Sequence, residues 1–399
     1  MKTKKMILIA LSSILMSCGA KTQKGEQVEV LPVVENWGVK MADAVMSRHD
    51  SLGFYNGRTV RGWSYDVAYL GNAINMLRHI DAKYANYMLA DMDQLVMPDG
   101  SVPRYDLEKF NIDYICPAKN ILLAWEQTGN EKYRLAAGQF IEQMKRHPKT
   151  ESGAYWHKQI YPWQVWLDGV YMGMPFLAEY AKDFDAPEWF DVATHEVILT
   201  YEKTCDPATG LLYHAWDESK AQRWCNPETG LSKHFWSRAM GWYVMAICDI
   251  LDYLPQEHKD RAELIAILQK CCDALLKVRD AESGCWYQVL DAGAKEGNYL
   301  EGSGTAMYVC AFAKGAQKGY LDAKYLEIAN EAFDDMVKQF IIVDEDGLPS
   351  MINICGSCGL GGEKNYREGT YEYYTTEKIV KNDCKGLAPF IEAAALLNK

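Results

Sequence analysis

The sequence predicts an all-α protein in which six helical hairpins close into a ring, an (α/α)6 barrel. Three observations predict this fold: similar glycine turns recur along the chain, pairs of helical patterns lie between them, and the turns are unequally spaced. The alternative is an open α-solenoid, but solenoids stack repeats of nearly constant length. We therefore expect a closed ring whose loops converge at one mouth.

The recurring turns share a glycine and, in most cases, a nearby aromatic residue. They are "NGRTVRGW" near Gly57, "DGSVPRY" at Gly100, "SGAYWH" at Gly153, "TGLLYH" at Gly210, "SGCWYQ" at Gly284 and "DGLPSM" at Gly347. An aromatic residue shortly after the glycine favours a brief extended segment. Each turn is therefore interpreted as the mark of one repeat.

Twelve helices are expected around these turns. Stretches such as "VAYLGNAINMLRHI", "YICPAKNILLAWEQT", "KYRLAAGQFIEQMKRH" and "AMGWYVMAICDILDYLP" place apolar residues at helical spacing. The expected starts lie near residues 37, 62, 84, 111, 130, 167, 187, 233, 258, 300, 322 and 384. "TGNEKY" and "DAPEWF" are short polar hinges of the kind that joins antiparallel helices.

The N-terminus predicts export and a lipid anchor. Residues 1–17 combine the basic "MKTKK" with the short apolar "MILIALSSILM", which is the layout of a signal peptide and too short to span a bilayer. "LMSC" resembles a bacterial lipobox, in which Cys18 is lipid-modified; an ordinary signal peptide is the alternative. We expect residues 18–32 to form a flexible tether and residues 33–399 a single (α/α)6 catalytic domain. The protein would be a monomer anchored to a bacterial membrane, facing the periplasm or the exterior.

Charge and cysteine content limit the possible partners and cofactors. The net charge of −12 argues against nucleic acid, although a few focused cations can still hold an anionic small substrate. Cys271 and Cys272 lie in a helical pattern and are predicted core residues. Cys355 and Cys358 form an isolated C-x-x-C, for which a loop disulfide or free thiols are favoured over a metal or redox site, because no partner pair lies at zinc spacing. No cofactor or metal is expected.

Asp168 is the one charged residue in the aromatic stretch "YPWQVWLDGVYMGMPF". An ionised carboxylate is costly to remove from water unless it is paired or hydrogen-bonded. Helix entry could explain Asp168 structurally, but a cap does not require tryptophan on both sides. Asp113, in "FNIDYICP", is a second candidate acid, with a helix cap as its structural alternative.

Other stretches combine aromatic and titratable residues: "RGWSYD", "YWHKQ", "LYHAWDE" and "SKHFWSRAMGWY". Tryptophan faces cover the apolar faces of sugar rings, and carboxylates accept hydroxyl hydrogens or transfer protons. His157 and His214 each follow a glycine turn, so a place at the mouth of the ring is about as expected as a structural role. Singly, each tryptophan is more often a core residue.

Long motifs resemble one enzyme family. "YPWQVWLDGVYMGMPFLAEYA", "GLLYHAWDESKAQRWCNPETGLSKHFWSRAMGWY", "SGCWYQVLD" and "YLEGSGTAMYVCAFAKGAQKGYLD" resemble the unsaturated rhamnogalacturonyl hydrolases of glycoside hydrolase family 105, relatives of the unsaturated glucuronyl hydrolases of family 88. The resemblance runs from about residue 35 to residue 397. It implies an (α/α)6 barrel, in agreement with the helix count.

The resemblance also implies a reaction on an oligosaccharide left by a pectin lyase, most often unsaturated galacturonyl-rhamnose from rhamnogalacturonan. Its non-reducing uronate has a double bond between carbons 4 and 5. An aspartic acid protonates carbon 4, water adds at carbon 5, the hemiketal opens, and the glycosidic bond breaks. The aspartate of "WLDG" matches the family's proton donor, which implies this role for Asp168. An apolar surround would raise its pKa and keep a proton available.

The remaining site residues are carried over motif by motif. Asp113 would orient Asp168 or the attacking water. The resemblance implies that the unsaturated sugar is lined by Tyr65, His157, Trp166, His214, Trp236, Arg238 and Trp242. Departures include Ser64, where a larger polar residue is expected, and a Gly- and Tyr-rich loop, "INICGSCGLGGEKNYREGTYEYY", placed to contact an extended substrate.

Two other functions fit the same residues. A conventional inverting glycosidase would use Asp113 and Asp168 as base and acid, with their carboxyl groups ~6.5–9.5 Å apart. A glycan-binding surface lipoprotein would need the aromatic platforms but no buried acid, so Asp168→Asn would leave its affinity nearly intact.

Overall fold

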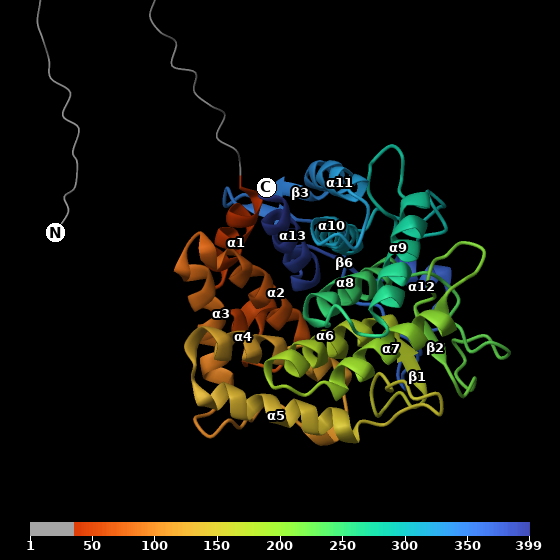
Figure 1. Cartoon of the computed structure of the whole chain (residues 1–399). Coiled ribbons are helices and arrows are strands. Elements are labelled where there is room, and N and C mark those ends of the chain that lie inside the picture. Colours follow the sequence, from red (N-terminus) through yellow and green to blue (C-terminus); the bar gives the residue numbers. More distant parts are fainter. Residues whose placement is uncertain (1–35) are drawn as a thin grey trace, which may run out of the picture. The chain divides into compact units, whose positions relative to one another are not determined.

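Six helices stand in a ring at the centre of the structure, which is a computed structural model that describes residues 36–399 (Figure 1). These inner helices are α2 (Tyr65–Asn75), α4 (Ala118–Thr128), α6 (Leu167–Asp183), α8 (Ser237–Tyr253), α10 (Gly302–Gln317) and α13 (Cys384–Leu397). Each contacts the next, and α13 contacts α2, so the ring closes. The predicted (α/α)6 barrel is confirmed.

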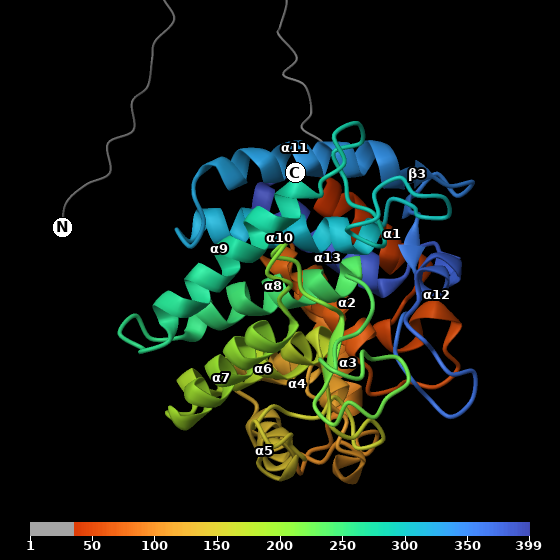
Figure 2. The same cartoon turned by 90° about the vertical axis from the view of Figure 1, so that its right-hand side faces the viewer.

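A second set of helices packs around the inner ring. The outer helices are α1 (Trp37–Arg48), α3 (Ala82–Leu95), α5 (Glu131–Arg146), α7 (Glu188–Thr204), α9 (Arg261–Lys277) and α11 (Lys324–Phe340). Figure 2, turned by 90°, shows α11 beside α10 and α7 beside α6, two pairs that are in contact. The outer helices complete the hairpins.

The inner and outer helices differ in how much of their surface is buried, as their patterns of apolar residues imply. Helix α8 is buried on nearly all sides, because only its last two residues are partly exposed. Helix α11 buries a single stripe at helical spacing: Tyr325, Ala329, Ala332, Phe333, Met336 and Phe340. A helix that is apolar all round belongs inside, whereas an amphipathic helix covers a core with one face.

The predicted helix starts agree with the structure within four residues, with one exception. The helix expected near residue 111 is α4, which begins at Ala118. The side chain of Asn111 accepts a hydrogen bond from the backbone N–H of Asp113 and caps a short 3₁₀ turn, Ile112–Tyr114. Pro117 is the residue directly before the helix. Further 3₁₀ turns cover Leu52–Gly57, Met76–His79 and Leu107–Lys109, and a short helix, α12, covers Tyr371–Thr376.

All six glycines that mark the repeats have positive φ, between 69° and 97°. An L-residue with a side chain rarely adopts this conformation, which explains the glycine in each turn. Each turn lies in the loop between an outer helix and the next inner helix. The six loops therefore lead into the N-terminal ends of the inner helices, at one end of the barrel.

Three short antiparallel pairs lie in these loops, and the first of them joins the loop before α6 to the loop before α8. They are β1 (Gln164–Trp166) with β2 (Ala215–Asp217), β3 (Ile341–Val343) with β4 (Pro349–Met351), and β5 (Ile354–Cys355) with β6 (Ile379–Val380). In the first pair Trp166 lies opposite Ala215, which places His214 beside the start of α6.

The N-terminal predictions fall on residues that the structure does not describe. The signal peptide, Cys18 and the tether all lie before residue 36. Residues 36–399 form one unit by their contacts. Within that unit, every helix falls short of the length and apolar character needed to cross a bilayer. Cys271 and Cys272 are fully buried in α9, as predicted.

Candidate active site

A cavity opens where the inner helices begin, and both predicted acids line it. Its volume is about 570 Å³, including space open to solvent. Its lining comprises Tyr65, Asp113, His157, Lys158, Tyr161, Trp166, Asp168, Met172, Ser357, Cys358, Gly359 and Arg367. Five of the predicted site residues are therefore brought together. Tyr65 begins α2 and Asp168 lies in the first turn of α6, so the positive ends of two helix dipoles are directed toward the cavity.

Asp113 is held by two basic side chains. Lys158 Nζ lies 2.6 Å from its Oδ2, and His157 Nε2 lies 3.5 Å from its Oδ1. Burial favours the neutral acid, but the charge of Lys158 and the nearby His157 outweigh that effect and lower the pKa of Asp113 below its usual value. Because Asn111 caps the turn, the carboxylate of Asp113 is not needed as a cap. Asp113 is therefore an ionised group in a buried site.

Asp168 has a different environment. His214 Nε2 lies 3.3 Å from its Oδ2, and among the described residues neither atom has a hydrogen-bond partner of ordinary geometry. The other ring nitrogen, Nδ1, lies 2.8 Å from the Tyr374 hydroxyl. Helix α6 has no side-chain cap, so helix capping does not explain Asp168. A buried carboxyl oxygen without a partner is rare in a folded protein and is expected where a substrate binds.

The tautomer of His214 links Tyr374 to Asp168. If the Tyr374 hydroxyl donates to Nδ1, the imidazole presents an Nε2–H to an ionised Asp168. If Nδ1–H donates to Tyr374, Nε2 accepts from a protonated Asp168. The same three side chains therefore fit Asp168 with or without its proton.

One wall of the cavity is a set of parallel rings. Trp166 stacks on His157 with ring centroids 4.4 Å apart and on Tyr161 with centroids 5.1 Å apart. Burial lowers the pKa of His157 to about 4, so this ring is neutral near neutral pH. A flat, uncharged aromatic wall suits the face of a sugar ring.

Two cations in the cavity were not predicted. Lys158 pairs with Asp113, and Arg367 Nη2 donates to the Tyr161 hydroxyl over 2.9 Å. Lys158 directly follows His157, and Arg367 lies in the Gly- and Tyr-rich loop that was expected to contact the substrate. A search for cations beside the candidate residues would have identified Lys158, whereas Arg367 is far in sequence from all of them.

Four predicted substrate contacts lie behind the lining. His214, Trp236 and Trp242 are at most 1% exposed, and Arg238 is equally buried. Arg238 Nη1 donates to the Cys355 carbonyl (2.5 Å) and to Ser303 Oγ (3.2 Å). Trp236 Nε1 donates to the Gln288 side chain (3.1 Å). Trp242 packs among tyrosines of the barrel interior. These residues support the cavity from behind.

Two further cavities adjoin the first one. Both share Tyr161 with it, and one also shares Arg367. Tyr366 and Gly362 line both of these outer cavities. Three cavities therefore meet around Tyr161, and the Gly- and Tyr-rich loop borders each of them.

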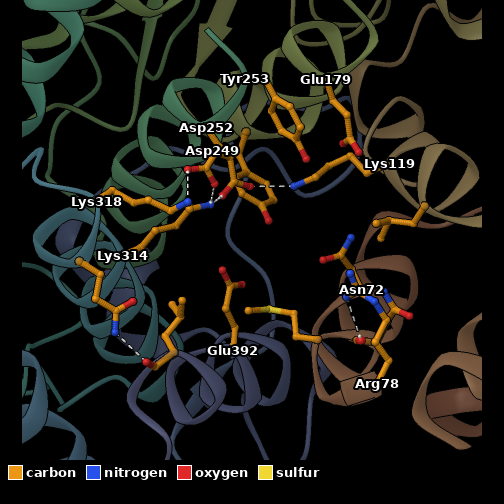
Figure 3. Close-up of a pocket in the computed structure, with 16 residues that line it drawn as sticks. Asn72, Arg78, Lys119, Glu179, Asp249, Asp252, Tyr253, Lys314, Lys318 and Glu392 are labelled. Carbon is orange, nitrogen blue, oxygen red and sulfur yellow. Dashed lines mark hydrogen bonds and ion pairs between the residues drawn. The ribbon is translucent and has the colours of Figure 1, made fainter. Parts of the chain in front are cut away.

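A separate cavity lies at the C-terminal ends of the inner helices and has a different character (Figure 3). Asp249 lies between Lys119 and Lys314, with Nζ–O distances of 2.8 and 2.7 Å. Glu392 points into the space from α13, and burial raises its pKa to about 7. Opposite charges here neutralise one another and join α4, α8 and α10, which indicates a structural ion network.

The described residues contain one group that could hold a metal ion, Asp191, His258 and Asp260. None of its members lines the cavity with the two acids. Lys259 forms ion pairs with both aspartates, which accounts for the cluster without an ion.

Comparison with known proteins identifies the family. The model of "Glycosyl Hydrolase Family 88" matches residues 37–398. A solved glycoside hydrolase from family 105 of C. acetobutylicum ATCC 824 is 43% identical, with a TM-score of 0.87 over 91% of this chain and 99% of that chain. An unsaturated rhamnogalacturonyl hydrolase of Bacillus subtilis, YesR, is 25% identical over 78% of this chain and 84% of its own length.

A more distant structure shares the fold alone. The unsaturated glucuronyl hydrolase of Bacillus sp. GL1 is 13% identical, with a TM-score of 0.64 over 90% of this chain and 94% of that chain. The matches to the family model and to the C. acetobutylicum protein both span nearly all of residues 36–399. The chain belongs to glycosyl hydrolase family 88 and groups with its family 105 relatives.

Proposed function

We propose that the protein removes the 4,5-unsaturated uronic acid from the non-reducing end of oligosaccharides produced by a lyase, and that its substrate is unsaturated galacturonyl-rhamnose from rhamnogalacturonan. The observation that carries this proposal is the pair of carboxyl groups in one cavity with opposite surroundings. Asp113 faces a lysine, whereas Asp168 faces a histidine that accommodates either of its protonation states.

From this difference we infer the roles of the two acids. Asp168 gives its proton to carbon 4 of the vinyl ether, and positive charge develops at carbon 5. Asp113, kept ionised by Lys158, orients a water molecule and accepts its proton as the water oxygen bonds to carbon 5. The hemiketal opens, and the glycosidic bond to the neighbouring sugar breaks.

The rest of the cavity fits an unsaturated uronate. The stacked rings of Trp166, His157 and Tyr161 offer a platform for the flattened sugar ring. Lys158 and Arg367 supply positive charge for the uronate carboxylate in a chain whose net charge is −12. The neighbouring sugar would extend past Tyr161 into the adjoining cavities. The rhamnogalacturonan substrate is supported by the likeness to the Bacillus subtilis enzyme.

The test follows the ultraviolet absorbance of the double bond during incubation with lyase-digested rhamnogalacturonan. The wild type should remove the absorbance, and Asp168→Asn should lower the rate ~10²- to 10⁴-fold, which is the usual contribution of a general acid. Persistence of the absorbance with wild type would refute this substrate. Parallel lyase digests of homogalacturonan and of glycosaminoglycans would then identify a different unsaturated uronide.

A further inference from the structure

The loop that closes the substrate cavity contains two thiols in contact. Cys355 Sγ and Cys358 Sγ lie 3.4 Å apart, and both side chains are buried. A disulfide bond needs ~2.05 Å between the sulfur atoms, so a small movement of the two side chains would bring them to bonding distance. Cys358 also lines the cavity, together with its neighbours Ser357 and Gly359.

The surroundings hold the pair in place. Gln288 Nε2 donates to Cys355 Sγ at 3.2 Å and to Cys358 Sγ at 3.6 Å. The backbone N–H of Cys355 donates to Glu301, and the carbonyl of Cys355 accepts from Arg238. One cysteine is thus fixed to the barrel, and the other sits on the turn that forms the cavity wall.

We propose that Cys355 and Cys358 form a reversible disulfide in the wall of the substrate cavity, and that this bond fixes residues 356–359 against the bound sugar. The reaction is thiol–disulfide exchange with a small disulfide oxidant. Cys358, reached through the cavity, attacks the oxidant as its thiolate and releases the first thiol. Cys355 then attacks Cys358 Sγ and releases the second. The two cysteines lose two protons and two electrons, and the oxidant is reduced to two thiols.

Access through the cavity sets the order of attack, because Cys358 lines the cavity and Cys355 does not. The electrostatics oppose the first step, since burial and the hydrogen bond to Cys355 raise the pKa of Cys358 well above its ordinary value. The hydrogen bond from Cys358 and the charge of Arg238 lower the pKa of Cys355, although burial opposes the thiolate. In the mixed disulfide Cys358 no longer has a thiol hydrogen to donate, so the charge of Arg238 is what favours the Cys355 thiolate in the second, resolving step. The pair is also linked to the proposed proton donor, because Gln288 Nε2 donates to the Tyr374 carbonyl (3.0 Å) and the Tyr374 hydroxyl meets His214.

The test begins with the thiols themselves. The protein is incubated with oxidised or reduced glutathione, denatured, alkylated and digested, and peptides are analysed by mass spectrometry. After oxidation, the peptide that contains Cys355 and Cys358 should carry no alkyl group and should be lighter by two hydrogen atoms. Cys205, a more exposed thiol outside the cavity, is the internal control and should remain alkylated or carry glutathione. Alkylation of both cavity thiols after oxidation, or two separate glutathione adducts, would overturn the proposal.

A kinetic measurement tests the effect on the cavity and rests on the proposed function. The oxidised form should show a KM roughly threefold lower than the reduced form, because a fixed wall needs less ordering when substrate binds. The double variant Cys355→Ser/Cys358→Ser should lose this response, and Cys205→Ser should keep it. An equal KM in both redox states would overturn the effect on the substrate. The labelling needs no substrate, so failure of the proposed function would leave its result intact.

Discussion

Replacing Lys158 with methionine tests whether this cation keeps Asp113 ionised. Lys158 Nζ lies 2.6 Å from Asp113 Oδ2, and the two side chains are 23% and 13% exposed. At an effective dielectric constant of ~20, unit charges 4 Å apart interact by ~4 kcal/mol, and partial exposure reduces this. An opposite charge at such a distance typically lowers a carboxyl pKa by ~1–3 units. His157 cannot replace the lysine charge, because burial lowers its pKa to about 4.

The direction in which Lys158→Met shifts the pH dependence follows from the lowered pKa of Asp113. Lys158 contributes stability above the unfolded-state pKa of the carboxyl group, and this contribution is lost as the pH falls through the folded-state value. Without Lys158, only the nearby His157 opposes the effect of burial, which is the larger of the two, so the pKa of Asp113 rises. The acidic limb of the activity profile should therefore move upward by ~1–3 pH units, and activity should recover at higher pH.

The assay measures kcat/KM from the loss of double-bond absorbance at low substrate concentration across the pH range. Lys158→Arg is the matched control, since it keeps a cation near Asp113, and its acidic limb should stay close to that of the wild type. If Lys158 also binds the uronate carboxylate, Lys158→Met lowers the plateau as well, but the plateau and the limb are read separately. An acidic limb in Lys158→Met that coincides with the wild-type limb would refute the reasoning.

Three further predictions address other parts of the protein. Tyr374→Phe removes the hydroxyl 2.8 Å from His214 Nδ1 and should lower kcat/KM roughly threefold to tenfold, without a matching change in the midpoint of urea unfolding. An unchanged kcat/KM would show that Tyr374 does not set the tautomer of His214. Asp249→Asn breaks two buried ion pairs and should lower the free energy of unfolding by about 3–5 kcal/mol in urea titrations, and a loss below about 1 kcal/mol would show that the network is not structural. We also propose that Cys18 is lipidated, so Cys18→Ala should move the protein out of the membrane fraction of fractionated cells; equal amounts in that fraction would exclude the anchor.

The helical ring could be predicted because its signals are local. An inner helix such as α8 is apolar on every side, and the hinge at Gly129 ends one helix with a positive φ of 63° before Asn130 caps the next. The start of α4 was placed too early, because the cap of a 3₁₀ turn and the start of a helix use the same residue types. The backbone geometry at Asn111 and Pro117 shows which of the two structures each residue begins, and the sequence does not show that geometry.

The candidate site was only partly predictable, because its assembly depends on contacts distant in sequence. Asp113 and Asp168 could be identified as candidates because each is an acid among aromatic and apolar residues in the sequence. Lys158, the partner of Asp113, is 45 residues away, and Arg367 comes from the far end of the chain. Trp236 and Trp242 illustrate what the aromatic content of a sequence leaves undecided. They share the aromatic signal of the site but serve as buried supports, and composition does not distinguish these two uses of tryptophan.

Hydration of the double bond by the enzyme is tested most directly by the product formed in heavy water. Proton transfer from Asp168 to one face of the sugar predicts a single deuterium at carbon 4, in one configuration, in NMR spectra taken early in the reaction. Asp168→Asn should form this product far more slowly. Release of a sugar that still contains the double bond, or deuterium in both configurations from the first time points, would contradict the account.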